Sequence, residues 1–465
     1  MVYSIKFGTD GWRAIIAKDY TVENVRRIAV GTLAWMQKRA YKRVVIGFDC
    51  RFGGPMFQEE IANILSQGGI ECLINKNFVS TPMVSLAVVN HQADLGIVIT
   101  ASHNPPGYNG YKLKSSYGGP TIPADIAELE AMIPDRVELN SLSSSEGNVN
   151  FKEPILIDAE TEYLDHIYKS FDIPQIRSKN KIAYDAMFGA GQNVMKKLFP
   201  EMKAFHCEHN PGFQNRAPEP ILKNLLEIQK FLQSNPGQYI GIANDGDADR
   251  LAMLDEHGNM IDSHHILLLL MHYLAGFKKM KGAAVVSCSV TNKLQQLAAH
   301  YNMKCIITKI GFKYISEYMI TEDVLVAGEE SGGLAIKGHI PERDGIFIAL
   351  TILQFMAETG KSITQLIEEV YSIVGPFAYD RLDLHLTDPQ IAEIKEALKK
   401  EKTNWGPLQV KRFENLDGAK YYFEDDAWMM IRTSGTEPVL RIYAQGKDME
   451  EVQQILNLTR AELNV

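Results

Sequence analysis

Short apolar strands alternate with amphipathic helices along most of the chain, and this alternation constrains the fold more than any other feature. In its first part, the pattern predicts helices at residues 21–39, 55–67 and 83–90 and strands at residues 44–49, 71–74 and 95–100. Strands joined through helices favour a mostly parallel sheet with right-handed crossovers. We therefore expect the chain to begin with an α/β unit.

The same alternation restarts twice further along the chain. It predicts helices at residues 158–171, 191–198, 221–233, 263–277 and 292–301, and strands at residues 181–186, 239–243, 283–287, 305–308 and 324–327. A polar run at residues 141–150 is typical of a surface loop near the first boundary. Three similar α/β units in series indicate an internal triplication, although their identity is too low to establish a repeat.

The character of the sequence changes after Gly375 and Pro376. Here we predict an alternating segment at residues 381–386, helices at residues 389–400 and 448–463, and strands at residues 421–424, 428–431 and 439–444. This pattern favours a small α+β domain with an antiparallel sheet. Because 465 residues exceed what one core can hold, we expect four domains, at residues 1–150, 151–255, 256–374 and 375–465.

Composition excludes several classes of protein. The net charge of −9 argues against nonspecific nucleic-acid binding, which needs clustered cations. The longest apolar run, at residues 266–271, is far below the roughly 18 residues of a membrane span, and residues 1–10 lack the features of a secretory signal. Five scattered cysteines suggest neither a disulfide framework nor a zinc site. We therefore expect a cytoplasmic protein that binds neither nucleic acid nor membrane.

An anionic small molecule remains compatible with this charge if cations gather locally. Seven cations stand in or beside glycine-rich loops: Arg13, Lys112, Arg250, Lys309, Lys313, Arg343 and Arg432.

Residues 95–114, read as LGIVITASHNPPGYNGYKLK, carry a candidate nucleophile. Ser102 and His103 follow the strand at the edge where open α/β sheets place their ligands. Two prolines and a glycine then prevent a covering helix, so we expect Ser102 to lie in the open. A hydroxyl needs activation to attack, and His103, Lys112 or a distant carboxylate could provide it. A polar loop without chemistry is the alternative.

Three aspartates at alternate positions, Asp245, Asp247 and Asp249, follow the predicted strand at residues 239–243. A tight turn can converge them on one cation, and their oxygens suit Mg²⁺ or Ca²⁺. A calcium loop is excluded because Arg250 occupies the position where that loop needs glycine. A metal-free acidic turn is the alternative, although such close like charges repel one another.

Two further loops carry polar residues. The GEESGG loop at residues 328–333 offers carboxylates and a hydroxyl that suit sugar hydroxyls, although a plain turn explains it as well. The RTSGTEP loop at residues 432–438 combines an arginine fork, hydroxyls and a glycine, which together favour an anion nest. An ordinary hairpin loop is the alternative there.

Four motifs in order carry a family resemblance: TASHNPP at residues 100–106, DGDADR at 245–250, GEESGG at 328–333 and RTSGTEP at 432–438. Their order and spacing resemble those of the α-D-phosphohexomutase family, and FGTDGWRA at residues 7–14 is similar to its N-terminal loop. The resemblance spans nearly the whole chain. It implies three mixed α/β domains and a C-terminal α+β domain around a central cleft, with one loop from each.

The resemblance also implies roles for individual residues. Ser102 would be the phosphoserine, and Asp245, Asp247 and Asp249 would hold Mg²⁺ together with the phosphate on Ser102. Arg13, His103 and Lys112 would stabilise charge or transfer protons. The implied substrate-binding residues are Arg250, Lys309, Gly311, Glu329, Ser331, His339, Arg343, Arg432, Ser434, Gly435 and Thr436.

The implied reaction moves a phosphoryl group between C1 and C6 of a hexose phosphate. Phosphoserine gives its phosphoryl group to the free sugar hydroxyl, and the resulting glucose 1,6-bisphosphate, also the expected activator, turns over and returns its other phosphate to Ser102. Residues 432–436, which would form a clamp for the phosphate that does not react, must accept either end of the sugar. We therefore expect hinge motion of the last domain, which carries this phosphate clamp. We expect a monomer or a weak homodimer.

Sequence details of the sugar loop favour glucose phosphates as substrates. GEESGG is closer to phosphoglucomutases than to the GEQSGH of phosphoglucosamine mutases or the GEMSGH of dual mannose/glucose enzymes, and GFK at residues 311–313 supports the same branch. Gly333 replaces the histidine of those loops, and His339 or Lys313 could substitute for it. Mannose phosphates and then glucosamine phosphates are the alternatives.

Two other classes of function remain open. A sugar-phosphate-binding protein without catalysis should lack the nucleophile or a carboxylate, yet Ser102 and all three aspartates are present. A phosphatase would hydrolyse the phosphoserine rather than pass its phosphoryl group on.

Overall fold

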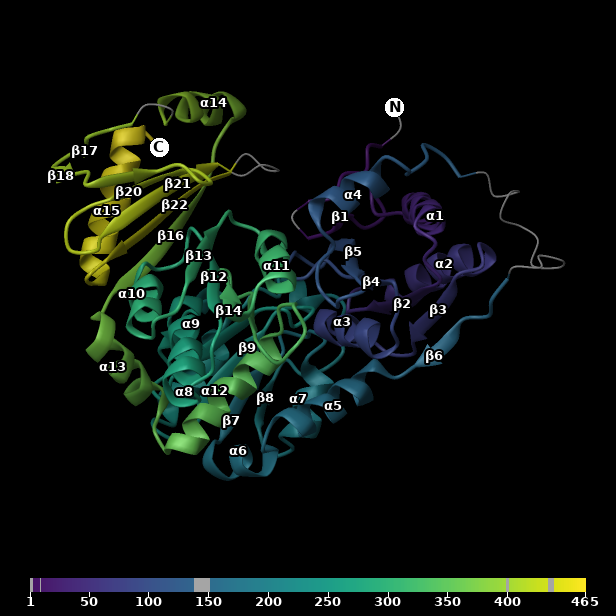
Figure 1. Cartoon of the computed structure of the whole chain (residues 1–465), viewed down its shortest axis with the longest axis horizontal. Helices are drawn as coiled ribbons and strands as arrows, with labels where there is room; N and C mark the ends of the chain where they lie inside the picture. Colours follow the sequence, from purple (N-terminus) through teal and green to yellow (C-terminus); the bar gives the residue numbers. More distant parts are fainter. Residues whose placement is uncertain (1–2, 9, 138–150, 399–400, 434–438) are drawn as a thin grey trace.

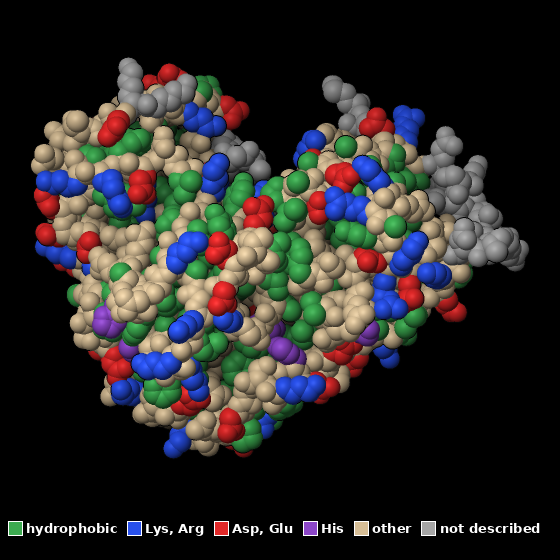
Figure 2. Space-filling view, viewed as in Figure 1, with side chains coloured by type: hydrophobic (Ala, Val, Ile, Leu, Met, Phe, Trp, Pro, Cys, Tyr) green, Lys and Arg blue, Asp and Glu red, His purple; other side chains and the backbone are tan. Residues whose placement is uncertain are grey.

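The computed structural model describes residues 3–8, 10–137, 151–398, 401–433 and 439–465. Four units follow one another along the chain, from the purple and blue unit at the N-terminus to the yellow unit at the C-terminus (Figure 1). The first and last units lie on opposite sides of an opening, which Figure 2 shows as a hollow between two lobes. This architecture of three mixed α/β units and an α+β unit around a cleft agrees with the prediction.

The first unit is built on a six-stranded sheet in the order β1-β5-β4-β2-β3-β6. Strands β4, β2, β3 and β6 run parallel, and β5 and β1 add an antiparallel edge. The elements are β1 (Trp12–Ile15), α1 (Val22–Lys38), β2 (Arg43–Phe48), α2 (Gly54–Gln67), β3 (Glu71–Asn75), α3 (Thr81–Asn90), β4 (Leu95–Ile99), β5 (Tyr108–Ser115), α4 (Pro123–Glu130) and β6 (Ile155–Ile157).

Local sequence explains where these helices begin. The Thr21 side chain accepts a hydrogen bond from the Asn24 amide at 3.2 Å, and Ser80 caps α3 through the Met83 amide at 3.3 Å. Strand β6 lies beyond the expected boundary after residue 150, yet it pairs with β3 of the first sheet. The predicted loop at residues 141–150 lies outside the described residues.

The second unit has a five-stranded sheet in the order β11-β10-β9-β7-β8. Its predicted helix at residues 221–233 is interrupted, because Leu225 leaves helical geometry with φ −106° and ψ 18° and buries its side chain. The elements are α5 (Ala159–Ser170), α6 (Ile173–Lys179), β7 (Ile182–Asp185), α7 (Gln192–Leu198), β8 (Lys203–Phe205), the 3₁₀ turns η2 (Phe213–Asn215) and η3 (Leu222–Asn224), α8 (Leu226–Ser234), β9 (Ile240–Asn244), β10 (Leu251–Leu254) and β11 (Met260–Ile261).

The third unit has a four-stranded sheet in the order β13-β12-β14-β15. Its first helix covers the predicted residues 263–277 but changes to π geometry at His272. The elements are α9 (Ser263–Met271), the π turn η4 (His272–Phe277), β12 (Ala283–Ser287), α10 (Lys293–His300), β13 (Cys305–Thr308), α11 (Phe312–Thr321), β14 (Val324–Gly328), β15 (Leu334–Ile336), α12 (Gly345–Thr359) and α13 (Ile363–Val374).

The fourth unit is an antiparallel sheet in the order β16-β22-β21-β20-β19 covered by α15. The elements are β16 (Ala378–His385), α14 (Asp388–Ala397), the small hairpin of β17 (Asn404–Trp405) and β18 (Leu408–Gln409), β19 (Arg412–Glu414), β20 (Ala419–Tyr422), β21 (Trp428–Thr433), β22 (Val439–Gly446) and α15 (Met449–Leu463).

Apolar packing divides the molecule unevenly. One large cluster of buried side chains runs through the second and third units and reaches one face of the first sheet, whereas the fourth unit has a core of its own. The third and fourth units meet through a small cluster that includes Cys288, Trp428 and Tyr443. At this junction the Lys420 ammonium lies 3.8 Å from the centre of the Trp428 ring and donates to the Cys288 carbonyl at 2.7 Å.

Within the described part of the chain, no single helix has the length and apolar character needed to cross a membrane. The bent pair α12 and α13 passes a test of length and composition alone.

Candidate active site

Ser102 stands in the loop that connects β4 to β5. Its backbone has φ +51°, a left-handed conformation that costs energy for a residue other than glycine. The Ser102 amide donates to Thr100 Oγ1 at 2.8 Å, and that hydroxyl donates to Asp49 Oδ2 at 2.6 Å. Burial raises the pKa of Asp49 to about 6, although Arg51 partly offsets it. The loop is therefore anchored to the end of β2.

Arg51 fixes the rest of this loop. Its guanidinium donates to four backbone carbonyls, those of Ser102 at 2.7 Å, Asn104 at 2.6 Å, Pro105 at 2.8 Å and Tyr108 at 3.0 Å. Such a set of bonds to one planar cation favours a single loop conformation. Sequence reasoning missed Asp49 and Arg51, although an acidic residue and an arginine directly after β2 were a usable signal.

The expectation that Ser102 lies in the open is wrong, because the residue is only 1% exposed. The aspartate loop of the second unit covers it: a Cβ at Gly246 would lie 2.5 Å from the Ser102 carbonyl oxygen. Thr81 of α3 also binds this loop through Asp247, with its amide on the backbone carbonyl at 3.0 Å and its hydroxyl on Oδ2 at 2.5 Å. Proline-rich sequence kept helices away but did not exclude a loop from another domain.

Ser102 and the three aspartates converge, as the motifs predicted. Ser102 Oγ donates to Asp245 Oδ2 at 2.6 Å, and His103 Nδ1 lies 3.3 Å from the same Oγ. Burial, and then the cations Arg250, Arg13, Lys112 and Arg51, hold the pKa of His103 well below its ordinary value. The imidazole is therefore neutral, and burial and the nearby cations oppose its protonation.

The acidic triad fits a hard divalent cation. Asp245, Asp247 and Asp249 each offer an oxygen within 4.8 Å of the other two. Oδ1 of Asp247 and Oδ1 of Asp249 are buried and accept no hydrogen bond from the described residues, which is costly for a carboxylate. Burial and the two neighbouring carboxylates also raise the pKa of Asp245. A cation among these oxygens would offset both effects, and oxygen-only ligands suit Mg²⁺.

Lys112 of β5 pairs with two carboxylates of the triad. Its Nζ lies 2.8 Å from Asp247 Oδ2, 3.0 Å from Asp249 Oδ2 and 2.9 Å from Asp10 Oδ2. Burial acts to lower the pKa of Lys112, but Asp10, Asp247 and Asp249 outweigh it and raise the pKa above its ordinary value. Lys112 therefore stays charged, which favours charge stabilisation over proton transfer. Asp10 was missed in the sequence.

Arg343 connects the third unit to the same network. Its Nη2 lies 2.7 Å from Asp249 Oδ2 and also pairs with Asp10. A Cβ at Gly333 would lie 2.4 Å from Arg343 Cδ, so the arginine occupies the space in which a larger side chain at position 333 would begin. The position of Arg343 is therefore compatible with glycine at position 333 but not with histidine there, unless Arg343 moves.

Lys114, the next inward-facing residue of β5, forms a buried ion pair. Its Nζ lies 2.6 Å from Glu342 Oε2, and neither side chain is exposed. Glu342 precedes Arg343, and Ser85 Oγ donates to it at 3.3 Å. This pair joins the first unit to the third, and sequence reasoning did not find it.

The two glutamates of the sugar loop point in different directions. Glu329 Oε1 accepts the Gly311 amide at 2.6 Å, and burial followed by its neighbour Glu330 raises the pKa of Glu329 to about 7. Glu330 instead binds Ser289 Oγ at 2.7 Å and Arg381 at 3.3 Å. Its carboxylate thus lies at the junction with the fourth unit.

The remaining predicted residues make contacts of other kinds. Arg13 donates to Asn104 Oδ1 at 2.7 Å, and the Arg250 amide donates to Asp245 Oδ1 at 3.0 Å. Ser331 is half-buried and Lys309 is exposed. Arg432 donates to Asp417 Oδ2 at 3.1 Å. Ser434, Gly435 and Thr436 lie outside the described residues.

His339 is not brought to the site. Its Nε2 lies 2.8 Å from Asp344 Oδ2, its Nδ1 lies 3.0 Å from His166 Nε2, and its ring stacks on Phe347. Both ring nitrogens are engaged between the second and third units, which gives His339 a packing role. It therefore offers no substitute for the histidine missing at position 333.

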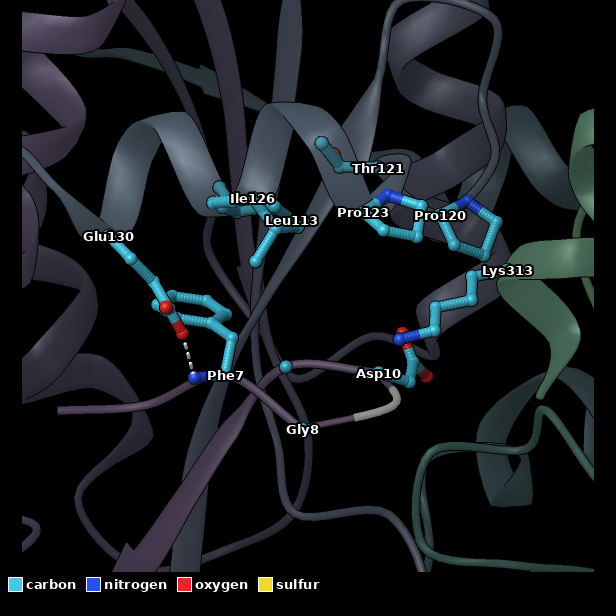
Figure 3. Close-up of a pocket in the computed structure, with 12 residues that line it drawn as sticks. Phe7, Gly8, Asp10, Leu113, Pro120, Thr121, Pro123, Ile126, Glu130 and Lys313 are labelled. Atoms are coloured by element: carbon cyan, nitrogen blue, oxygen red, sulfur yellow. Dashed lines mark hydrogen bonds between the residues drawn. The ribbon is translucent and has the colours of Figure 1, made fainter. Parts of the chain in front are cut away.

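A cavity of about 160 Å³ lies beside Asp10, between the N-terminal loop and α4 (Figure 3). Figure 3 shows Lys313 extending from the third unit toward Asp10 at one end, with the apolar side chains of Phe7, Leu113 and Ile126 farther inside. Of the two residues that could replace the missing histidine, the structure therefore places Lys313, and not His339, near the network.

Comparisons with known proteins agree with this geometry. Four domain families of phosphoglucomutase/phosphomannomutase match in series: alpha/beta/alpha domain I at residues 4–139, domain II at 161–258, domain III at 262–374 and the C-terminal domain at 384–461. A phosphoglucomutase/phosphomannomutase from Thermococcus kodakarensis is 30% identical over 462 residues and 97% of each chain. A phosphoglucosamine mutase from Methanococcus vannielii is 30% identical over 461 residues, also 97% of each chain.

A phosphoglucomutase/phosphomannomutase family protein from Burkholderia thailandensis shares the fold, with a TM-score of 0.82 at 20% identity over 100% of this chain and 98% of that one. With the four matched domains, the convergence of Ser102 with the aspartates and the 30% identical relatives, the chain belongs to the phosphoglucomutase/phosphomannomutase family of phosphohexomutases, whose members are isomerases.

Proposed function

We propose that this enzyme moves a phosphoryl group reversibly between O1 and O6 of a hexose phosphate, with glucose phosphates as preferred substrates. One observation carries the proposal: the buried Ser102 Oγ lies 2.6 Å from Asp245 Oδ2, among carboxylates that fit a divalent cation. Ser102 is the residue carried as phosphoserine. Hexose 1,6-bisphosphate is the intermediate, and glucose 1,6-bisphosphate serves as the activator.

The proposed reaction has two transfers. In the first, O6 of glucose 1-phosphate attacks the phosphoserine, the Oγ–P bond breaks, and the sugar hydroxyl loses its proton. In the second, Ser102 Oγ loses its proton and attacks the phosphorus at C1 of the turned bisphosphate, the O1–P bond breaks, O1 takes up a proton, and glucose 6-phosphate leaves. Bound Mg²⁺ at the three aspartates would offset charge on the transferring group.

The residues around Ser102 suit these steps. Lys112, kept charged by three carboxylates, stabilises negative charge on the phosphoryl oxygens. His103 lies 3.3 Å from Oγ, within reach to exchange a proton with it, and the charge of a bound phosphoryl group would favour the protonated imidazole that burial and nearby cations otherwise oppose. Arg13 adds a second cation from β1, held through Asn104.

The sugar and its distant phosphate bind across the opening. Glu329 and Ser331 contact the sugar hydroxyls, with Lys309, Gly311, Arg250 and Arg343 around them. Arg432, Ser434, Gly435 and Thr436 hold the phosphate that does not react. A cytoplasmic location and a monomeric or weakly dimeric state stay predictions.

Glucosamine phosphate is the second candidate substrate, because the relative from Methanococcus vannielii is named a phosphoglucosamine mutase at the same 30% identity. The test is kcat/KM for the phosphates of glucose, mannose and glucosamine, measured with Mg²⁺ and a trace of the matching bisphosphate. A glucosamine value equal to or above the glucose value would overturn the preference. Steady release of phosphate from glucose 6-phosphate without isomerisation would identify a phosphatase instead.

Removal of the divalent cation should stop turnover. We expect chelation with EDTA to lower kcat by at least about a hundredfold, since the cation stabilises charge on the transferring group. Asp247→Asn should raise the Mg²⁺ concentration for half-maximal activity by roughly tenfold or more, because it removes one charged ligand. Titration of Mg²⁺ into wild type, Asp247→Asn and Glu227→Gln checks both. Glu227 is an exposed carboxylate of the same unit, and an equal shift in its variant would contradict the assignment.

Substrate affinity should increase as the pH rises through neutrality. The pKa of Glu329, about 7, places its protonated form at pH 6 and its carboxylate at pH 8. A carboxylate accepts hydrogen bonds from sugar hydroxyls more strongly than the neutral acid does. We therefore expect KM for glucose 1-phosphate to fall between pH 6 and pH 8.

The substrate phosphate also titrates in this range, so the comparison is made with Glu329→Gln. That variant should lose the part of the KM change that belongs to Glu329 while keeping the part that belongs to the substrate. Parallel KM profiles for wild type and Glu329→Gln would refute the assignment.

A further inference from the structure

The predicted phosphate clamp and the sugar loop lie on different units, yet one carboxylate connects them. Asp417, in the turn between β19 and β20, accepts Arg432 Nε at 3.1 Å and the backbone amide of Ile310 at 3.0 Å. Both donors use the same oxygen, Oδ2. The next amide along the chain, that of Gly311, binds Glu329 Oε1 at 2.6 Å. Two consecutive amides therefore hold one carboxylate from each unit.

Glycines make this arrangement possible. Gly418 has φ +107°, and a Cβ there would lie 2.6 Å from the Ile431 carbonyl oxygen and 3.2 Å from Arg432 Cβ. The turn that carries Asp417 thus lies directly against β21 beside Arg432. Gly311 has φ +130°, which only glycine adopts readily, and this conformation presents its amide to Glu329.

A second contact links the same two units in parallel. Arg381 of β16 lies 3.3 Å from Glu330, the neighbour of Glu329, and Glu330 also accepts Ser289 Oγ at 2.7 Å. Both glutamates of the sugar loop are therefore tied to the fourth unit, one through the Ile310–Gly311 amides and one directly. Because the fourth unit has its own apolar core, these directional contacts can set its orientation on the third unit.

We propose that Asp417 is a positioning residue that aims the Arg432 guanidinium and couples the phosphate clamp to the sugar loop. The proposal rests on the proposed function of the site. Asp417 touches neither sugar nor phosphate and acts through Arg432 on one side and through Ile310 and Gly311 on the other. A substrate that binds Arg432 and Glu329 together gains affinity because both side chains are positioned before it binds. Recognition of its distant phosphate and recognition of its sugar are then coupled.

The test measures binding of glucose 6-phosphate by calorimetry to the full chain carrying Ser102→Ala, which removes turnover. Asp417→Ala should weaken binding by about tenfold, the usual scale of coupling between sites. In an Arg432→Ala background, the same change should weaken binding by at most about threefold, because only the route through Ile310 and Gly311 is then left and residues that act through one another are not additive. Equal losses in both backgrounds, or no loss in either, would overturn the proposal.

Asp417→Asn guards against a variant that fails to fold. Asparagine keeps an oxygen for the Ile310 amide but loses the charge that faces Arg432. With Ser102 intact, we expect it to raise KM for glucose 1-phosphate by roughly fivefold or more while changing kcat by less than about threefold. A fall in kcat of roughly fivefold with unchanged KM would refute the proposal that Asp417 positions Arg432 for substrate binding. Glu462→Gln, an exposed carboxylate of α15 paired with Lys402, should leave both constants unchanged.

The two levels of the argument fail in different ways. If the parent protein binds none of the phosphates of glucose, mannose and glucosamine and turns none of them over, the proposed function fails and this inference fails with it. If the parent protein binds glucose 6-phosphate and the Asp417→Ala protein binds it equally well, only the inference fails.

Discussion

Replacing Ser102 by alanine should lower the rate of glucose 1-phosphate isomerisation by at least about a hundredfold, the scale expected for loss of a nucleophile. The hydroxyl is the group that would carry the phosphoryl, and it is already held 2.6 Å from Asp245. Without it, the carboxylates, Lys112 and Arg343 remain in place, but the site has no hydroxyl to accept the phosphoryl group. The variant should also take up no phosphate from glucose 1,6-bisphosphate, which mass spectrometry of the intact chain measures.

Ser372→Ala is the matched control, because its Oγ only caps the exposed end of α13 through the Glu369 carbonyl. It should keep wild-type rate and phosphate uptake. Phosphate uptake by Ser102→Ala at the wild-type level would place the modified residue elsewhere. Full activity of that variant would remove the phosphoserine mechanism altogether.

Lys114→Met should destabilise the protein by about 3 kcal/mol, since breaking a buried ion pair leaves a charge without its partner. Methionine fills similar space, so loss of packing is small. Among the described residues, Glu342 would keep the Ser85 hydroxyl at 3.3 Å and the Arg343 amide at 3.0 Å as donors, beside the more distant Arg343 Nε at 3.6 Å. Asp10 would also lose Lys114, 3.4 Å away, but would keep Lys112 and Arg343. Urea unfolding followed by circular dichroism measures the change.

The double variant Lys114→Met/Glu342→Gln tests the cause. It should recover at least half of the lost stability, because no unpaired charge is left behind. Lys402→Met breaks a partly exposed pair with Glu462 and should change stability by less than about 1 kcal/mol. Since several domains unfold, each change in free energy is taken from the shift in the midpoint of the first transition and the slope of that transition. No recovery in the double variant would show that Lys114 contributes through packing.

Most of the strands and helices that were predicted are present in the structure, because their determinants are local, but helices α11, α12 and α13 were not predicted. Apolar period, glycine and proline placement and caps such as Thr21 set most boundaries within a few residues. The break at Leu225 was not predictable, because it depends on a side chain buried against the core of the second unit. The pairing of β6 with the first sheet across residues 138–150 likewise depends on a partner strand distant in sequence.

The site was predictable at its chemical centre and not in its surroundings. Ser102, the aspartates and Lys112 could be named because their chemistry demands those residue types. The burial of Ser102 and the direction of the Glu330 side chain depend on contacts between units. The supporting roles of Asp10 and Arg51 depend on contacts with residues of the first unit that are distant in sequence. His339 shows the same limit, since its neighbours Asp344 and His166 occupy both ring nitrogens. Short-range sequence patterns do not predict which loop of one unit packs over a loop of another unit.

The position of Lys420 over the Trp428 ring has a spectroscopic consequence. The chain has four tryptophans, and Trp12 and Trp35 lie in the first unit while Trp405 and Trp428 lie in the fourth. Tryptophan emission therefore originates only in the two units that flank the opening (Figure 1). Lys420 and Trp428 lie on neighbouring strands of the fourth unit, and Lys420 also donates to the Cys288 carbonyl of the third unit. A rearrangement that breaks the bond to Cys288 would release the ammonium from its place over the indole, and we expect the emission of Trp428 to shift as a result. Trp428 is thus an intrinsic fluorescence probe of the junction between the third and fourth units, and no added label is needed.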